Sequence, residues 1–258
     1  MKRLRRPLLI VGLVVAASVY AYGFEGGGHQ IRLLRHLVST GVQIVAPLVA
    51  TLGCLVAARA YASGDRERLV WSTGALAALS WAAGRMVFAA DQWWGGIISQ
   101  SPSVADGFSV LFYVLLGVAL LMEVRLVGPM IDRPVRLGLL ALGVAGLVAG
   151  FVFVVEPIVQ SSTSSIEKAL AAFYPSAAVF FIPAGLAPAV GFRGGTSAYV
   201  WLAVALGALC LALASLGHAM LSSYGLYSEV HSINALWVGG FMLLALGGFW
   251  QRMVQEEV

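Results

Sequence analysis

Charged residues are scarce in this sequence of 258 residues. Lysine and arginine together number 16, and aspartate and glutamate 12, so only 11% of the chain is charged. Soluble globular proteins carry about 25% charged residues, which they need to cover a hydrated surface. Hydrophobic residues make up 60% of the chain, and its mean hydropathy is +0.88. We therefore expect lipid, not water, to be the main solvent of this protein.

Cysteine and catalytic motifs are also sparse. The two cysteines, Cys54 and Cys210, lie inside long apolar runs, where cysteine acts as a small packing residue rather than as a disulfide partner or metal ligand. The sequence contains no glycine-rich phosphate loop, no GxSxG elbow and no HExxH pair. With no catalytic residue to assign, we expect a protein that is not an enzyme.

Long apolar runs dominate the rest of the chain. A bilayer core of about 30 Å is crossed by roughly 20 apolar residues in a helix, because backbone groups cannot remain unpaired in lipid. Residues 19–21 (VYA) would fit a signal-peptidase site, which would leave seven spans, but we expect the first span to be retained. The chain is thus predicted to be an all-α, polytopic membrane helix bundle, a single transmembrane domain over residues 1–258. Its eight predicted spans are 7–23, 38–61, 69–90, 104–124, 136–156, 167–190, 197–222 and 231–250.

The basic residues give an orientation. Positive charge accumulates in cytoplasmic segments of membrane proteins, and the basic clusters here alternate between the apolar runs. With both termini in the cytoplasm, only Arg32, Arg35 and Lys168 fall outside. This spacing is a topology pattern, not a nucleic-acid-binding stripe, and it predicts a multi-pass protein of the cell inner (plasma) membrane. The predicted cytoplasmic set is Lys2, Arg3, Arg5, Arg6, Arg59, Arg66, Arg68, Arg125, Arg133, Arg136, Arg193 and Arg252.

A weak internal repeat relates two predicted helical hairpins, 69–124 and 197–250. Residues 103–108 (SVADGF) enter one helix and residues 232–237 (SINALW) enter another, each after a small-residue helix with a late polar residue. A four-helix unit used twice in the same orientation would give this pattern, and chance similarity between apolar hairpins is the alternative. Glycines in 136–156 predict close helix packing more than dimerisation. The glycines are Gly143, Gly146 and Gly150.

Prolines are expected to interrupt the span 167–190. They are Pro175, Pro183 and Pro188.

Ionisable residues inside the predicted spans are the best indication of a site. Such groups are costly in lipid and usually face a bundle interior or water. Arg85 lies inside the third span, and Asp106, at the start of the fourth, is its preferred partner over Asp91. The alternatives are that Arg85 extends to the headgroups while Asp106 or Ser103 caps the helix, or that Arg85 contacts a ligand. The candidate ligand-binding residues are Arg85, Asp91, Trp94, Asp106, His218 and His231.

The four histidines raise the question of a haem or metal site. His29, His36, His218 and His231 all fall on the predicted exterior side. Haem b needs two histidines at matched depth on neighbouring helices, and only His218 lies well inside a span. No HxxxH, CxxC or CxxCH spacing is present. We assign no metal ligand, and the sequence leaves any cofactor unknown.

Several segments resemble a known family. Residues 80–91 (SWAAGRMVFAAD), 102–113 (PSVADGFSVLFY) and 173–175 (FYP), with 223–227 (SYGLY) and 235–240 (ALWVGG), are similar to the multi-helix membrane sensor region ahead of bacterial diguanylate cyclases and histidine kinases. The resemblance covers about residues 70–250. Ala178 and His218 depart from it, since the family often has aspartate at both places.

The resemblance implies a non-enzymatic membrane sensor or binding subunit. Only residues 251–258 follow the last span, so a signal would pass in trans to a cytoplasmic signalling protein or another membrane subunit, and the chain could also pair with a second copy of itself. A small transporter or channel is the first alternative, favoured by the repeat. A structural or cofactor-bearing subunit of a membrane complex is the second.

Overall fold

The computed structural model describes residues 5–23, 29–94, 102–160 and 164–256. These ranges are helical apart from short connections and contain no β-strand. A π-helical turn, η3 (Phe151–Val155), joins α5 to α6, and a 3₁₀ turn, η2 (Gly128–Met130), follows α4. The helices are α1 (Arg5–Gly23), α2 (His29–Ala58), α3 (Arg66–Trp94), α4 (Val104–Val127), α5 (Arg133–Gly150), α6 (Glu156–Gln160), α7 (Ser165–Gly191), α8 (Ser197–Ser223) and α9 (Asn234–Glu256).

The prediction of an all-α fold is confirmed, and each of the eight predicted runs contains a helix. Among the described residues, five helices are long and apolar enough to cross a membrane, which indicates a multi-pass membrane protein. They lie at Gln30–Ala58, Val104–Met130, Arg133–Val155, Ser165–Gly191 and Ser197–Ser223.

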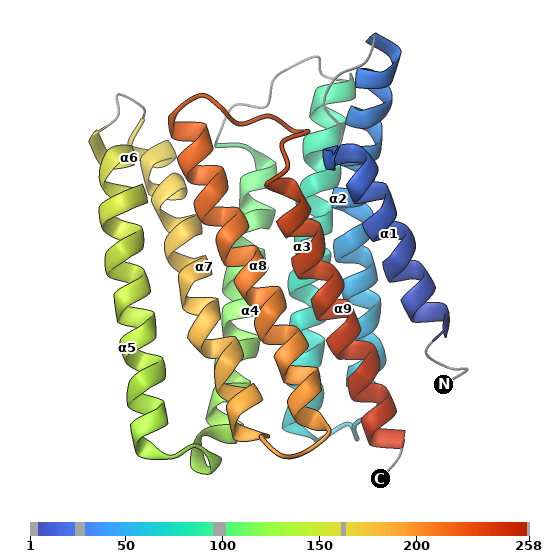
Figure 1. Cartoon of the computed structure of the whole chain (residues 1–258), viewed down its shortest axis with the longest axis vertical. Helices are drawn as coiled ribbons and strands as arrows, with labels where there is room; N and C mark the ends of the chain where they lie inside the picture. Colours follow the sequence, from blue (N-terminus) through green and yellow to red (C-terminus); the bar gives the residue numbers. More distant parts are fainter. Residues whose placement is uncertain (1–4, 24–28, 95–101, 161–163, 257–258) are drawn as a thin grey trace.

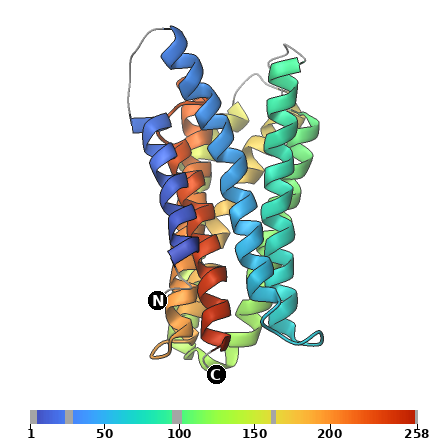
Figure 2. The same ribbon diagram turned by 90° about the vertical axis from the view of Figure 1, so that its right-hand side faces the viewer.

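Six helices form a closed ring in which each packs against the next, in the order α2, α3, α4, α7, α8, α9 and back to α2. α1 lies outside the ring against α2 and α9, and α5 lies outside it against α7, at opposite edges of the view (Figure 1). The helices run nearly parallel to the long axis of the bundle (Figures 1 and 2). We call the end that holds α6 the upper end, and the end where α9 finishes the lower end.

Glycine lets several ring helices approach to backbone contact. A Cβ on Gly53 of α2 would lie 2.6 Å from the carbonyl oxygen of Ala245 in α9, and a Cβ on Gly248 would overlap the backbone of Gly53. Between α8 and α9, a Cβ on Gly207 would lie 2.9 Å from the Gly240 oxygen. Small residues at such contacts allow close packing, which drives helix association where lipid removes the hydrophobic driving force.

The predicted packing of α5 is confirmed. A Cβ on Gly146 would lie 2.7 Å from Val179 of α7, and one on Gly143 would lie 3.3 Å from Pro183. The glycine face of α5 therefore packs against α7. The expected interruption of α7 is wrong: its prolines lie within one continuous helix, Ser165–Gly191. Membrane helices accept proline because neighbouring groups compensate for the lost backbone hydrogen bond.

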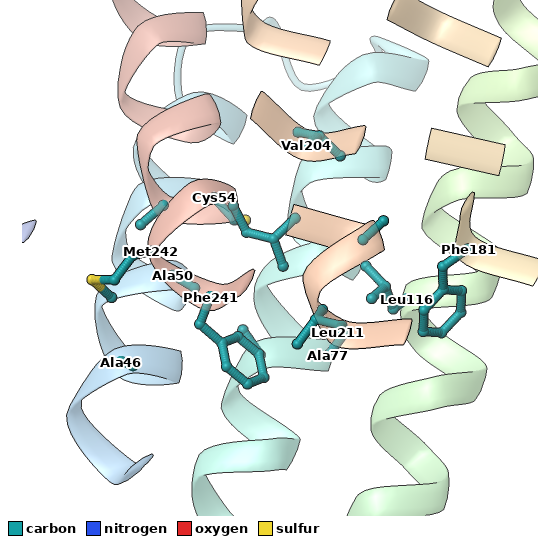
Figure 3. Close-up of a cluster of buried hydrophobic side chains, with 14 of the residues drawn as sticks. Ala46, Ala50, Cys54, Ala77, Leu116, Phe181, Val204, Leu211, Phe241 and Met242 are labelled. Carbon is teal, nitrogen blue, oxygen red and sulfur yellow. The ribbon is translucent and has the colours of Figure 1, made fainter. Parts of the chain in front are cut away.

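The core fills the ring with apolar side chains from every ring helix. Figure 3 shows Leu116 of α4, Phe181 of α7, Leu211 of α8 and Phe241 of α9 among the buried residues. Phe181 and Phe241 are each 1% exposed and Leu211 is fully buried. This packed layer separates the two ends of the bundle and defines the floor of the site described next.

Candidate functional site

A cavity of about 640 Å³ lies at the upper end of the bundle. Its walls come from residues 81–88 of α3, the first turns of α4 and α7, the last turns of α8 and the 224–233 segment that connects α8 to α9, with single residues from α2, α6 and α9. Ligand pockets for small molecules usually measure about 300–1,000 Å³ and combine apolar walls with a few polar groups. The size and position of this cavity fit a small-molecule site.

An ion pair crosses the cavity wall. Arg85 Nη2 donates to Glu229 Oε2 at 2.8 Å, and both side chains are less than one-fifth exposed, at 16% and 18%. The guanidinium carbon of Arg85 lies 4.8 Å from the centre of the Phe88 ring, a cation–π contact. Its Nε is buried and has no hydrogen-bond partner. Arg85 thus keeps one unused donor in a wall of the cavity.

The predicted pairing of Arg85 with Asp106 is wrong, because Glu229 is the residue that pairs with Arg85. Asp106 instead caps α4, as the alternative prediction held: its Oδ2 accepts from the Ser103 N–H at 2.8 Å. Its Oδ1 accepts from the Tyr174 hydroxyl of α7 at 3.0 Å. The helix N-terminus favours a negative charge at this position. Asp106 therefore joins α4 to α7 at the cavity wall.

Two further polar pairs line the cavity. The hydroxyl oxygens of Tyr113 in α4 and Ser215 in α8 lie 2.6 Å apart and share a hydrogen bond. The His218 ring of α8 packs edge-on against Tyr227, with centroids 4.2 Å apart. Tyr227 lies outside the predicted spans, and burial, with a smaller effect of the Glu229 charge, raises the pKa of its hydroxyl. Tyr227 consequently acts as a neutral hydrogen-bond donor.

Hydrogen bonds fix the 224–233 segment over the cavity. Asn234, which is fully buried, donates through Nδ2 to the backbone oxygens of Ser228 (3.3 Å) and Glu229 (3.0 Å). Its Oδ1 accepts from the Tyr227 hydroxyl at 3.1 Å. Ser39 of α2 donates to the same Glu229 oxygen at 2.6 Å. The backbone that carries Glu229 is thus held from both sides, so the carboxylate is preorganised toward Arg85.

Aromatic rings form the cavity floor. Trp81 of α3 and Trp237 of α9 stack with centroids 4.5 Å apart, and both line the cavity. Trp81 also packs against the buried rings of Phe112 and Phe241, with ring centroids 4.9 Å and 5.8 Å apart. Tyr113 stacks on Phe181 at 5.6 Å. The floor is therefore a continuous aromatic layer that joins the cavity to the packed core.

The structure brings three of the six candidate ligand-binding residues together and leaves three outside. Arg85, Asp106 and His218 line the cavity. Asp91 and Trp94 lie near the end of α3, beyond its walls, and Trp94 is 86% exposed. His231 accepts from the backbone N–H of Ile233 at 3.1 Å and so closes a turn before α9. These three are not lining residues because α3 continues to Trp94, a turn above the cavity, and because His231 serves the local turn.

Metal chemistry gains no support from the described residues, which contain no group of three histidine, cysteine or acidic side chains able to hold an ion. The side chain of His29 lies outside the described set. Among the histidines whose side chains the structure describes, His218 lines the cavity, and its neighbour there is the Tyr227 ring.

Sequence reasoning missed Glu229, Tyr174, Tyr227 and Glu123. Glu229 lies 144 residues from Arg85 in the chain, and no local pattern indicates such a pairing. Tyr174 stood in the quoted FYP step, which could have marked it. Glu123 was overlooked near the lower end of α4, where its side chain is only 2% exposed.

Comparisons of the chain with protein-family models, curated proteins and solved structures find no match. The resemblance to bacterial sensor regions therefore stays a prediction that rests on the residues quoted for it.

Proposed function

We propose that this chain is a non-enzymatic sensor of the cell inner membrane that binds a small molecule in its exterior half and acts on a cytoplasmic partner. In this proposal all eight long helices cross the bilayer and both termini are cytoplasmic. The lower end of the bundle is then cytoplasmic, and the cavity faces outward. The basic side chains support this orientation, because those of the connections at the lower end, such as Arg59, Arg133 and Arg193, outnumber those at the upper end.

The observation that carries the proposal is a mixed-polarity cavity above a packed core. Its polar groups come from α2, α3, α4, α7, α8 and the 224–233 segment, and hydrogen bonds join several of them between elements. Ionisable residues kept inside a membrane protein mark functional sites by default. The aromatic floor and the fully buried Leu211 fill the ring below it. This arrangement favours binding from one side over free passage through the bundle.

The helices that line the cavity also reach the lower end, so they connect the site to the cytoplasmic face. α7 begins beside the cavity at Glu167 and ends at Gly191, where Arg193 pairs with Asp132 at 2.8 Å. α9 follows the segment that carries Glu229 and continues to Glu256, and the Nε2 of its Gln251 donates to the Tyr61 hydroxyl at 2.6 Å. A ligand can change the structure of the lower end only if the helix bundle has two packing arrangements and the ligand binds them with different affinities.

Occupancy of the cavity is tested by native mass spectrometry on the full chain isolated from its own membranes. The wild type is expected to carry a bound non-lipid mass, and Ala171→Trp, which fills the cavity, is expected to lose it. Leu140→Trp is the matched control, because Leu140 lies on the outer face of α5 and is 66% exposed. A bound mass that survives Ala171→Trp, or its loss in Leu140→Trp as well, would contradict the cavity as the binding site.

Coupling is tested by hydrogen exchange. Loss of the bound molecule in Ala171→Trp should alter exchange at residues 59–65 and 249–256, at the lower end, while Leu140→Trp exchanges as the wild type does. Unchanged exchange at the lower end would leave a binding protein without a sensor function.

Transport is the second candidate, and one observation favours it. The neighbour relations of α1, α2, α3 and α4 recur in α5, α7, α8 and α9: α1 packs on α2 as α5 packs on α7, and each following helix packs on the next. The ring closes through α4 with α7 and α9 with α2. Many transporters bind their substrate between two such repeats. Flux of the bound molecule into liposomes that contain the wild type, and its loss in Ala171→Trp, would favour transport over sensing.

A further inference from the structure

We infer that the molecule bound in the cavity is a small organic cation, an amine or quaternary ammonium group attached to an apolar body. The inference rests on the proposed function and specifies its ligand. It follows from two independent features of the lining, the balance of its charges and the number of its aromatic rings.

The lining carries more negative than positive charge. Asp106, Glu167 and Glu229 face the cavity, whereas Arg85 is the lining's one basic side chain among the described residues, histidine aside. Glu229 neutralises Arg85 at 2.8 Å. The carboxylates of Asp106 and Glu167 remain to attract a cation.

Neutral donors hold these two carboxylates without cancelling their charge. Asp106 accepts from the Ser103 N–H and the Tyr174 hydroxyl. Glu167 accepts from the Ser164 N–H at 2.8 Å and lies in the first turn of α7. Helix N-termini stabilise negative charge at both places. The site therefore gains most from a ligand that brings a positive charge.

The walls offer ring faces for the same cation. Besides Phe88, the lining holds Trp81, Tyr113, Tyr174, Tyr224, Tyr227 and Trp237. Ammonium groups bind over aromatic faces, with tryptophan the strongest partner, and rings arranged around a cavity are a known means of holding quaternary ammonium ligands. The contact of Arg85 with Phe88 at 4.8 Å shows a cation already accommodated on this wall.

An anionic ligand fits less well. An anion that approaches Arg85 would meet Glu229, which occupies Nη2, and like charges at close range cost several kcal/mol. The buried, unpartnered Nε of Arg85 is better satisfied by a neutral acceptor, such as a hydroxyl, ether or carbonyl oxygen of the ligand. The ligand class is thus a cation that also carries a neutral oxygen.

Three probes of one shape and three charges test the inference: benzylammonium, benzyl alcohol and benzoate. Binding to the full chain in phosphatidylglycerol nanodiscs is measured by calorimetry, with empty nanodiscs subtracted. We expect benzylammonium to bind at least about tenfold more tightly than benzyl alcohol, and benzoate to give no saturable binding, since tenfold corresponds to 1.4 kcal/mol. Nanodiscs of phosphatidylethanolamine separate the two sources of an ammonium group, because a headgroup that occupies the cavity would suppress benzylammonium binding there.

Variants of the two carboxylates test whether they are the groups that bind the cation. Asp106→Asn, which keeps the cap geometry, should lower benzylammonium affinity about tenfold and leave benzyl alcohol unchanged; Glu167→Gln should act the same way more weakly. Asp132→Asn is the matched control, since Asp132 lies at the lower end and is 62% exposed. Equal or tighter binding of benzyl alcohol or benzoate would overturn the cation class while leaving the cavity a binding site. If no probe binds although a molecule still copurifies, the cation class fails and the proposed function stands; if neither occurs, both fail.

Discussion

The Arg85–Glu229 ion pair allows the effect of burial to be measured against an internal reference. Arg193 and Asp132 form a second pair with the same N–O distance of 2.8 Å, but their side chains are 65% and 62% exposed, against 16% and 18% for Arg85 and Glu229. At 2.8 Å the gross attraction is about 6 kcal/mol at an effective dielectric of 20 and about 1.5 kcal/mol in bulk water. Because the geometry is matched, any difference between the pairs in unfolding free energy reflects their surroundings.

Double-mutant cycles supply the numbers. Loss of one partner from a fully buried pair costs 3–5 kcal/mol, and the partial exposure of Arg85 lowers this expectation to about 2–3 kcal/mol for Glu229→Gln. The double variant Arg85→Gln/Glu229→Gln should recover much of this loss, since no unpaired charge remains. The coupling energy of the pair is then about 2 kcal/mol, whereas the cycle of Arg193→Gln with Asp132→Asn should give less than about 0.5 kcal/mol.

Unfolding in mixed micelles with increasing dodecyl sulfate, followed by circular dichroism, measures each free energy. Equal coupling energies in the two cycles would refute the reasoning, because they would mean that Arg85 is solvated as well as Arg193 is. A double variant as unstable as Glu229→Gln alone would refute it differently, by showing that the damage does not come from an unpaired guanidinium.

Three further predictions concern packing, the cavity cover and pH. Gly248→Ala should cost about 1–3 kcal/mol because its Cβ would overlap backbone of α2, while Gly239→Ala on the same helix, with no atom within 4 Å, should be neutral or slightly stabilising in the same micelle assay. Asn234→Ala should destabilise the protein by about 1–3 kcal/mol, because the Ser228 backbone oxygen and the Tyr227 hydroxyl lose a partner while the Glu229 oxygen keeps Ser39, and thermal unfolding should show it. Burial raises the pKa of Tyr61 to about 12 from an ordinary value near 10. The stability that depends on its neutral hydroxyl is therefore complete below pH 10 and is lost as the pH rises toward 12. Over this range, the unfolding midpoint of Tyr61→Phe should fall less than that of the wild type.

Hydropathy predicts the helices of this protein because lipid leaves the backbone few choices. Every span had to be a helix, so each apolar run of suitable length located one. The first and last residues of the helices were predicted less accurately than their positions along the chain. α2 begins at His29, nine residues before the predicted span 38–61, because a helix continues past its apolar part when polar residues such as Gln30 and Arg32 still favour it. Hydropathy locates the part of a helix inside the membrane and not its full length.

The residues of the site were also only partly predictable from the sequence. Arg85, Asp106 and His218 could be selected from the sequence, because an ionisable residue in an apolar run is conspicuous by itself. Glu229 could not, since it lies in a polar connection where a glutamate is ordinary, and its role arises only when α3 and the 224–233 segment meet. Tyr113 and Tyr174 lie in the quoted segments 102–113 and 173–175, but an aromatic residue alone does not indicate a site, because aromatic residues are common in membrane proteins. Pairings between distant elements depend on the ring of helices, which local patterns do not specify.

The ring is not equally rigid at every contact, and this bears on how occupancy of the cavity could reach the lower end. α9 contacts α2 and α8 through glycines, at closely packed backbone-to-backbone contacts that leave little room for a shift of either helix. α4 meets α7 through side chains instead: Phe181 lies 3.7 Å from where a Cβ on Gly117 would be, and the Tyr174 hydroxyl binds Asp106. An ammonium group that takes Asp106 as its counter-ion competes with Tyr174 for the same carboxylate. In the proposed function, the α4–α7 contact is therefore where a bound cation would change the packing first, and α7 would connect that change to the lower end of the bundle.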